Sequence, residues 1–155
     1  MNRIHKFLQL PRPDQGLLIQ AMLGLTVVTL GLRLLPWLTL QRLLLKLANR
    51  VTRGEPAQRP SPHRLGWAIR VASRYVPQAT CLPQALMAQF LLHQWAYSAD
   101  LRIGVTKNKD EKLEAHAWVI CGDEIISGAG GDPDRFKPLS PTKKRKDAKD
   151  YANPL

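Results

Sequence analysis

Apolar positions dominate the first third of the chain and repeat with the spacing of an α-helix. Residues 16–32 contain no charged side chain and are rich in Leu, Val and Met, which predicts a long helix ending near Arg33. Pro36 follows, and proline breaks a helix because it lacks an amide donor and clashes with the preceding turn. A second helix is predicted over residues 38–50, with one apolar face formed by Leu40, Leu43, Leu44 and Leu47. This pattern predicts a helical hairpin whose apolar faces pack on the rest of the protein.

Membrane association is a second interpretation of the same apolar segment. A transmembrane helix needs about 20 apolar residues. The uncharged run is shorter than that and contains Gln20, Thr26 and Thr29. We therefore expect the hairpin to pack on the protein, and peripheral membrane contact remains the alternative.

Two further helices are predicted after residues 52–62, a proline-rich polar stretch typical of a linker. Ser61 is a good N-cap for a helix over residues 62–75, which Pro77 ends. The next helix opens at residues 80–81 and continues to about residue 97.

From residue 100 the apolar period changes from that of a helix to that of a strand. Leu101, Ile103 and Val105 alternate with polar or small residues, which predicts a half-buried strand. Further strands are expected over residues 113–121 and 124–127, joined by a tight turn at 122–123, with a short strand within 136–139. The order of elements predicts an α+β fold. We divide it into a helical region (1–60), a core (61–140) and a basic tail (141–155).

Composition narrows the class of protein. A length of 155 residues suits one domain, and two cysteines without a secretory signal pattern indicate a reducing cytosol. The net charge is +11, and residues 1–60 carry nine Lys or Arg against two Asp or Glu. Such a balance favours acidic partners, among them nucleic acid, anionic lipid or an acidic peptide. The basic tail lacks interleaved aromatic residues, so we expect no nucleic-acid partner. The four histidines and two cysteines show no ligand spacing, so we expect neither a metal nor another cofactor.

Cys81 and His116 are the candidate chemical residues. Cys81 falls in the first turn of a predicted helix, where free amides and the positive helix end favour a thiolate. His116 lies in the middle of a predicted strand and is a candidate proton carrier. A cysteine at a helix start facing a histidine on a strand is the layout of papain-like nucleophilic sites. A packed thiol and a core histidine without catalytic role remain the alternative.

Three short sequence motifs carry a family resemblance. They are CLPQAL at 81–86, LRIGV at 101–105 and EAHAWV at 114–119, and the last is followed by GDEIISG at 122–128. In this order and spacing they resemble the lasso-peptide maturation B proteins, leader peptidases of the transglutaminase-like superfamily related to the microcin-processing protein. The resemblance covers roughly residues 67–139. The helical N-terminus is similar to that of stand-alone members, since it lacks the alternating strand pattern of a leader-recognition domain.

The resemblance implies a papain/transglutaminase-like core and a cysteine peptidase that removes the leader from a ribosomally made precursor peptide. In that scheme Cys81 attacks the scissile carbonyl, and His116 takes its proton and returns one to the leaving amine. The Cys81 amide would help hold the oxyanion, with Gln78 as a candidate second donor. The partners implied are the precursor, a small leader-binding protein and an ATP-dependent cyclase that closes the macrolactam ring.

The third catalytic residue is where the chain departs from the family. The family's aspartate falls twelve residues after the histidine, and that position here is Gly128. Asp132 is the candidate replacement, with Asp134 just beyond it, whereas Asp123 at the hairpin tip lies too far away. A Cys–His pair can also act alone or use a carbonyl or an amide as the orienting group.

Other interpretations remain open at this point. Trp118 lies two residues after His116 on the same strand face, where it shields the imidazole, walls a substrate groove or packs in the core. The same Cys–His pair also suits acyl transfer to an amine. A third hypothesis is a basic, membrane-associated adaptor whose catalytic triad has decayed at Gly128. We interpret Cys121, which has no base nearby in sequence, as incidental.

Overall fold

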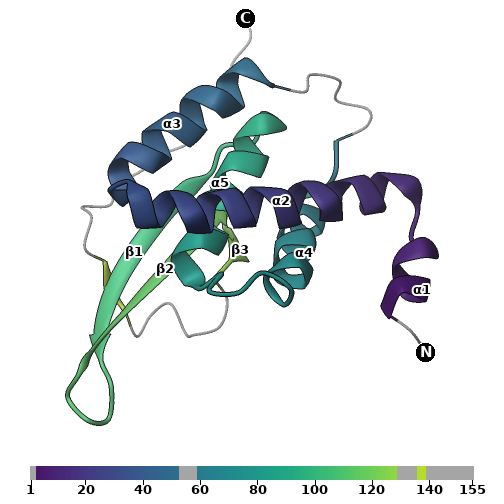
Figure 1. Ribbon diagram of the computed structural model, residues 1–155. Helices are drawn as coiled ribbons and strands as arrows, with labels where there is room; N and C mark the ends of the chain where they lie inside the picture. Colours follow the sequence, from purple (N-terminus) through teal and green to yellow (C-terminus); the bar gives the residue numbers. More distant parts are fainter. Residues whose placement is uncertain (1–2, 53–58, 129–135, 139–155) are drawn as a thin grey trace, which may run out of the picture.

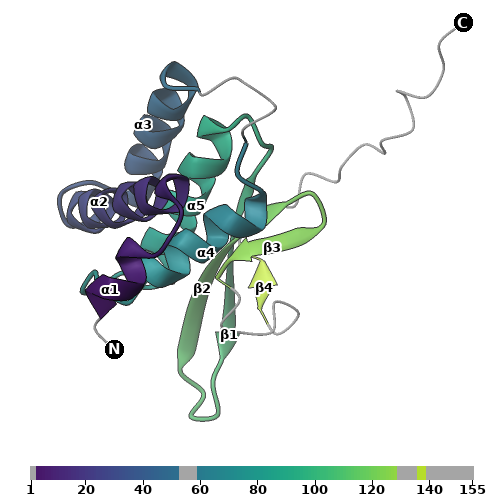
Figure 2. The ribbon, with the colours of Figure 1, turned by 90° about the vertical axis from the view of Figure 1, so that its right-hand side faces the viewer.

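A computed structural model describes residues 3–52, 59–128 and 136–138 of the chain. Within these residues, five helices precede a four-stranded antiparallel sheet (Figure 1). The helices gather on one side, and the hairpin of the two longest strands reaches beyond them (Figure 2). The α+β class predicted from the sequence is confirmed. The elements are α1 (Arg3–Leu8), α2 (Arg12–Leu34), α3 (Trp37–Arg50), α4 (Pro62–Ser73), α5 (Cys81–Gln94), β1 (Asp100–Lys107), β2 (Leu113–Cys121), β3 (Glu124–Ser127) and β4 (Lys137–Pro138).

Prolines set the limits of the N-terminal helices. Pro13 lies in the first turn of α2, where its missing amide costs nothing. Leu35, just before Pro36, is extended with φ −129°, as expected for a residue that precedes proline. The chain then re-enters a helix at Trp37. The predicted break at Pro36 is confirmed, and α2 begins four residues earlier than the uncharged run indicated.

One hydrophobic core joins α2, α4 and α5 to the sheet. Among its fully buried side chains are Leu25 of α2, Leu65 and Ile69 of α4, and Leu86 of α5. The N-terminal helices α2 and α3 contribute side chains to the same core as the rest of the chain. The boundary proposed near residue 60 remains a prediction.

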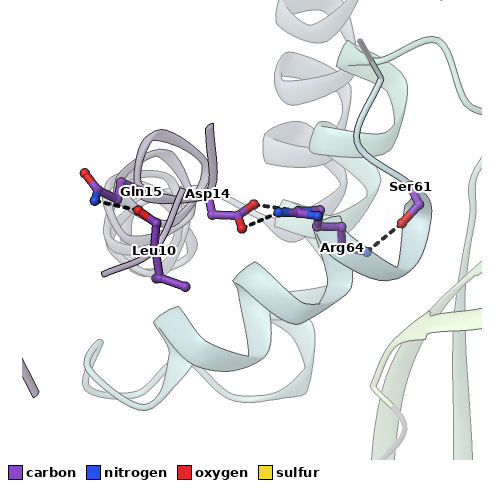
Figure 3. A network of polar contacts seen from close by, with 5 residues as sticks. All are labelled: Leu10, Asp14, Gln15, Ser61 and Arg64. Atoms are coloured by element: carbon purple, nitrogen blue, oxygen red, sulfur yellow. Dashed lines mark hydrogen bonds and ion pairs between the residues drawn. The ribbon is translucent and has the colours of Figure 1, made fainter. Parts of the chain in front are cut away.

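An ion pair fixes α2 against α4 (Figure 3). The Asp14 carboxylate accepts two hydrogen bonds from the Arg64 guanidinium, one of them from Nε at 2.5 Å. Asp14 is 6% exposed, so the partner neutralises an otherwise buried charge. The Ser61 hydroxyl accepts from the Arg64 amide at 3.3 Å, which confirms Ser61 as the N-cap of α4.

The apolar face predicted for α3 is partly wrong. Leu40 and Ala48 are buried, but Leu43 and Leu47 are 50% and 49% exposed. Residues four apart lie along one line of a helix, and only the line that contains Leu40 and Ala48 faces the core. Gly31 of α2 admits the Leu40 side chain closely, since a Cβ on Gly31 would lie 3.1 Å from Leu40 Cδ1. The neighbouring line, which contains Leu43 and Leu47, therefore faces solvent.

α2 is long and apolar enough to cross a membrane, judged by length and composition alone. Its outer face is exposed and carries Ile19, Met22, Leu23, Val27, Leu30 and Leu34. Its inner face is buried in the core. The helix is therefore apolar on both faces, although the protein covers only one.

Strand register determines which side chains share a face of the sheet. β2 pairs with β1 so that Leu101 lies opposite Val119 and Ile103 opposite Ala117. These four side chains contact or join the helical core. A bulge near Val119 and Ile120 shifts the pairing of β2 with β3. β4 is a two-residue edge strand on the other side of β1.

Candidate active site

The structure places Cys81 as the first residue of α5, as the sequence predicted. The thiol is free, partly exposed and packed at the margin of the helical core. Thr80 precedes it in an extended conformation and makes no side-chain capping hydrogen bond. The amides in the first turn of a helix have no intrahelical acceptor. Pro83 has no amide hydrogen, so in α5 these free donors are the amides of Cys81 and Leu82. Two donors at a positive helix end suit a sulfur anion or an oxyanion.

The loop before Cys81 is held by Gln78. This residue has a φ of +63°, a left-handed conformation that costs a residue with a Cβ about 1–2 kcal/mol. Its carbonyl accepts from the Thr80 amide at 2.8 Å, and its side-chain oxygen accepts a hydrogen bond from Arg33 of α2. The C-terminal end of α2 thereby supports the start of α5. An oxyanion role for Gln78 remains a prediction.

His116 lies on β2, and its imidazole packs in a cluster of aromatic side chains. Its imidazole stacks on Phe136, with ring centroids 5.1 Å apart, and on Trp118 at 6.1 Å. Trp118 is 5% exposed and packs over Gly104, the cross-strand neighbour of His116. A Cβ on Gly104 would lie 2.9 Å from the indole, so the absence of a side chain there makes room for the ring. The imidazole is therefore packed on two aromatic rings.

The Gly128 carbonyl holds the imidazole from a third direction. One step beyond the Val119–Ser127 pair, Gly128 lies opposite Trp118 and diagonal to His116. His116 Nε2 donates a hydrogen bond to the Gly128 carbonyl oxygen. A carbonyl can only accept, so Nε2 must carry the proton and the neutral ring keeps its lone pair on Nδ1. This is the tautomer that a general base acting through Nδ1 requires.

Comparison with known proteins gives the family. A protein-family model described as the transglutaminase-like superfamily matches residues 25–141, about three quarters of the chain. The chain belongs to the transglutaminase-like superfamily. This superfamily includes cysteine peptidases and transglutaminases, and its members are typically cysteine-dependent enzymes. Neither the curated proteins nor the solved structures contain a match to this chain.

In this transglutaminase-like chain, main chain lies at the position where the resemblance to the lasso-peptide maturation B proteins places an aspartate. Gly128 has a φ of +86°, and a Cβ there would lie 2.4 Å from the Ala117 carbonyl oxygen. A side chain therefore does not fit, and the Gly128 carbonyl meets the imidazole instead. A carbonyl or an amide is the substitute expected for the missing acid, but the sequence does not identify which group lies beside the imidazole. Asp132 and Asp134 lie outside the described residues, so the role predicted for Asp132 remains a prediction.

The structure brings His116, Trp118 and Phe136 together but does not join them to Cys81. Ala117 and Val119 enter the helical core, so the alternation of β2 turns His116 and Trp118 to the opposite face. Within the described residues, no hydrogen bond links the Cys81 thiol to the imidazole. The catalytic pairing of these two residues remains a prediction. Phe136, which the sequence suggested only as part of a short strand, is an additional member of the site.

The second cysteine has a different environment. Cys121 lies at the end of β2, paired with Glu124 across the turn. Partial burial raises the pKa of the Cys121 thiol, and the neighbouring Glu124 carboxylate raises it further. A raised pKa keeps the sulfur protonated and unreactive at neutral pH. Within the residues that the structure covers, no three or more His, Cys, Asp or Glu side chains are grouped to hold a metal ion.

Proposed function

We propose that this transglutaminase-like protein is a cysteine peptidase that removes the leader from a ribosomally made, lasso-type precursor peptide. Cys81 is the nucleophile and His116 the proton carrier. The observation that carries the proposal is the hydrogen bond from His116 Nε2 to the Gly128 carbonyl, at the position where the resembling peptidases have an aspartate. It supports the proposal because it offers an orienting contact for the imidazole at a position where the sequence has no acid.

The chemistry needs two half-reactions. The Cys81 sulfur attacks the scissile carbonyl, and Nδ1 of His116 takes the thiol proton and passes it to the departing amine. The acyl group remains on sulfur as a thioester, and the oxyanion faces the free amides of Cys81 and Leu82. Water, deprotonated by the same Nδ1, then releases the leader as a carboxylic acid and restores the thiol.

This mechanism requires the thiol and the imidazole to come within hydrogen-bond reach. Catalytic hydrogen bonds are often long or misaligned without substrate and tighten when it binds. The structure places the imidazole on the face of β2 that points away from the helical core, so we propose that precursor binding rearranges the start of α5 or the strand that carries His116. Rearrangement of this kind is a common way for enzymes to exclude water and assemble their catalytic groups.

The proposed substrate class and partners follow from the resemblance of the three sequence motifs to those of lasso leader peptidases. We propose a leader-binding protein that delivers the precursor and a cyclase that uses the released core peptide. The net charge of +11 favours an acidic leader or carrier.

The deciding experiment incubates the protein with a lasso precursor and its leader-binding protein, and follows the products by mass spectrometry. Wild-type protein should yield a free leader acid. Cys81→Ala and His116→Gln should each lower the rate by about 10³-fold or more, whereas Cys121→Ser should leave it unchanged. A leader joined to an added amine would identify an acyl transferase. Normal precursor processing with Cys81→Ala would rule out both enzymes and favour the adaptor.

A second experiment tests the Cys–His pairing by thiol reactivity instead of cleavage, in the presence of precursor. In a Cys121→Ser background, the rate of Cys81 alkylation by iodoacetamide is measured against pH, with and without His116→Gln. If the imidazole stabilises the thiolate, removing it slows alkylation at neutral pH. Identical profiles in the presence of bound precursor would show that the two groups do not interact.

A further inference from the structure

The outer face of α2 forms an exposed apolar ridge. Its members recur at helical spacing along one line, and Leu23, Val27 and Leu34 are 64%, 63% and 83% exposed. No charged residue interrupts α2 between Asp14 and Arg33. Contiguous apolar surface of this kind marks an interaction site on a soluble domain. We define the apolar ridge as Ile19, Met22, Leu23, Val27, Leu30 and Leu34.

Positive charge is carried by the same pair of helices, α2 and α3. Arg33, at the end of α2, and Arg42, Lys46 and Arg50 of α3 are all exposed. In the described stretch 3–52 the single acidic residue is Asp14, which is buried and paired with Arg64. The exposed charge of α2 and α3 is therefore entirely positive. Leucines interleaved with Lys and Arg on a surface helix are typical of helices that lie in the headgroup region of a bilayer.

A groove that the ridge residues Ile19, Leu23 and Val27 help to line indicates the kind of partner. It lies between α2, α3 and α5, has a volume of about 1130 Å³, and is lined mainly by apolar side chains such as Leu44, Met87 and Phe90. A rigid protein surface would need a matching protrusion to fill this hollow. Acyl chains are flexible and fill an irregular apolar groove without such complementarity.

We propose that α2 and α3 dock this protein on the surface of an anionic lipid bilayer, with the apolar ridge and the groove facing the acyl chains. α2 lies along the membrane and does not cross it, because its opposite face is buried on α4 and α5 and Asp14 is bonded to Arg64. A spanning orientation would expose these core contacts to lipid. This inference does not depend on catalysis.

Flotation of the full-length protein with phospholipid vesicles tests the proposal. The protein should float with vesicles that contain phosphatidylglycerol and bind less to pure phosphatidylcholine, with binding that falls as salt rises. Leu23→Gln combined with Val27→Gln should weaken binding at least tenfold, because both side chains lose apolar contact with lipid. Lys46→Gln should weaken it about fivefold.

Leu113→Gln is the matched control, since Leu113 is 77% exposed at the start of β2, far from the ridge in sequence. Its vesicle binding should equal that of the wild type. Thermal unfolding by circular dichroism shows whether each variant is folded, and the ridge side chains are exposed enough to replace. Absence of binding to anionic vesicles, or equal binding by the ridge variant, overturns the proposal. Light scattering would detect a dimer. If the protein does not bind vesicles and the ridge variant abolishes a dimer, the ridge contacts a second copy of the chain and the proposal is overturned.

Discussion

Substitution of Gly128 gives the sharpest test of the site geometry. A Cβ at this position would lie 2.4 Å from the Ala117 carbonyl oxygen and 2.8 Å from Trp118 Cβ. The first distance is roughly 1 Å shorter than an ordinary non-bonded contact. Gly128→Ala must therefore push the Gly128 carbonyl away from His116. A displacement of about 1 Å at a catalytic group costs about 10²-fold in rate, and we expect kcat/KM for precursor cleavage to fall by this factor.

The same substitution also lowers stability. The φ of +86° costs a residue with a Cβ about 1–2 kcal/mol, and the overlap adds about 1–3 kcal/mol. Urea unfolding should thus show a loss of about 2–5 kcal/mol. Gly122→Ala is the control, because Gly122 has a φ of +65° with open space around it. It should lose about 1 kcal/mol and keep full activity.

Gly128→Asp separates this geometry from the expectation of a restored triad. It introduces the acid that the resembling peptidases carry, so a rate at or above that of the wild type would refute the assignment of the carbonyl as the orienting group. We expect it instead to behave as Gly128→Ala does, because its Cβ meets the same atoms. Nitrogen NMR of the wild-type imidazole gives an independent check. A proton on Nδ1 of the neutral ring would contradict the bond to Gly128.

Three further predictions concern stability and thiol chemistry. Ala96 has a φ of +57° and follows α5, where the Tyr97 amide reaches back to the Leu92 carbonyl at 2.9 Å. Ala96→Gly should raise stability by about 1 kcal/mol, or about 2–4 °C in Tm, and an unchanged or lower Tm would show that the backbone is unstrained. In a variant that lacks the other cysteine, alkylation of Cys121 should have its pH midpoint above that of a free thiol, because burial raises the pKa; a lower midpoint would contradict the packing of β2. Arg64→Met should lower Tm more than Asp14→Asn does, since it leaves a buried carboxylate without a partner. Equal losses would show that the buried carboxylate needs no cation.

The helices and strands could be predicted because their signals are local. Proline and the Ser61 cap set the helix limits, and the alternation around Leu101 and Ile103 identified a strand, so these boundaries agree with the structure to within a few residues in most cases. Cys81 was placed at a helix start by the same reasoning.

What could not be predicted depends on tertiary contacts. Leu43 and Leu47 carry the pattern of a buried face, but the way α3 crosses the core leaves them in solvent. The contact between His116 and the Gly128 carbonyl involves main chain, which every residue possesses, so no residue type marks it. Phe136 joins the imidazole through the pairing of β4 with β1, a long-range contact without a local pattern.

The central sheet separates two packed layers, with helices on one face and the His116, Trp118 and Phe136 rings on the other. Side chains on opposite faces of β2 share few neighbours, so changes in the two layers should be close to additive in their effect on folding. Substitutions in the helical layer away from Cys81 should therefore leave the packing of the imidazole on Trp118 and Phe136 unchanged.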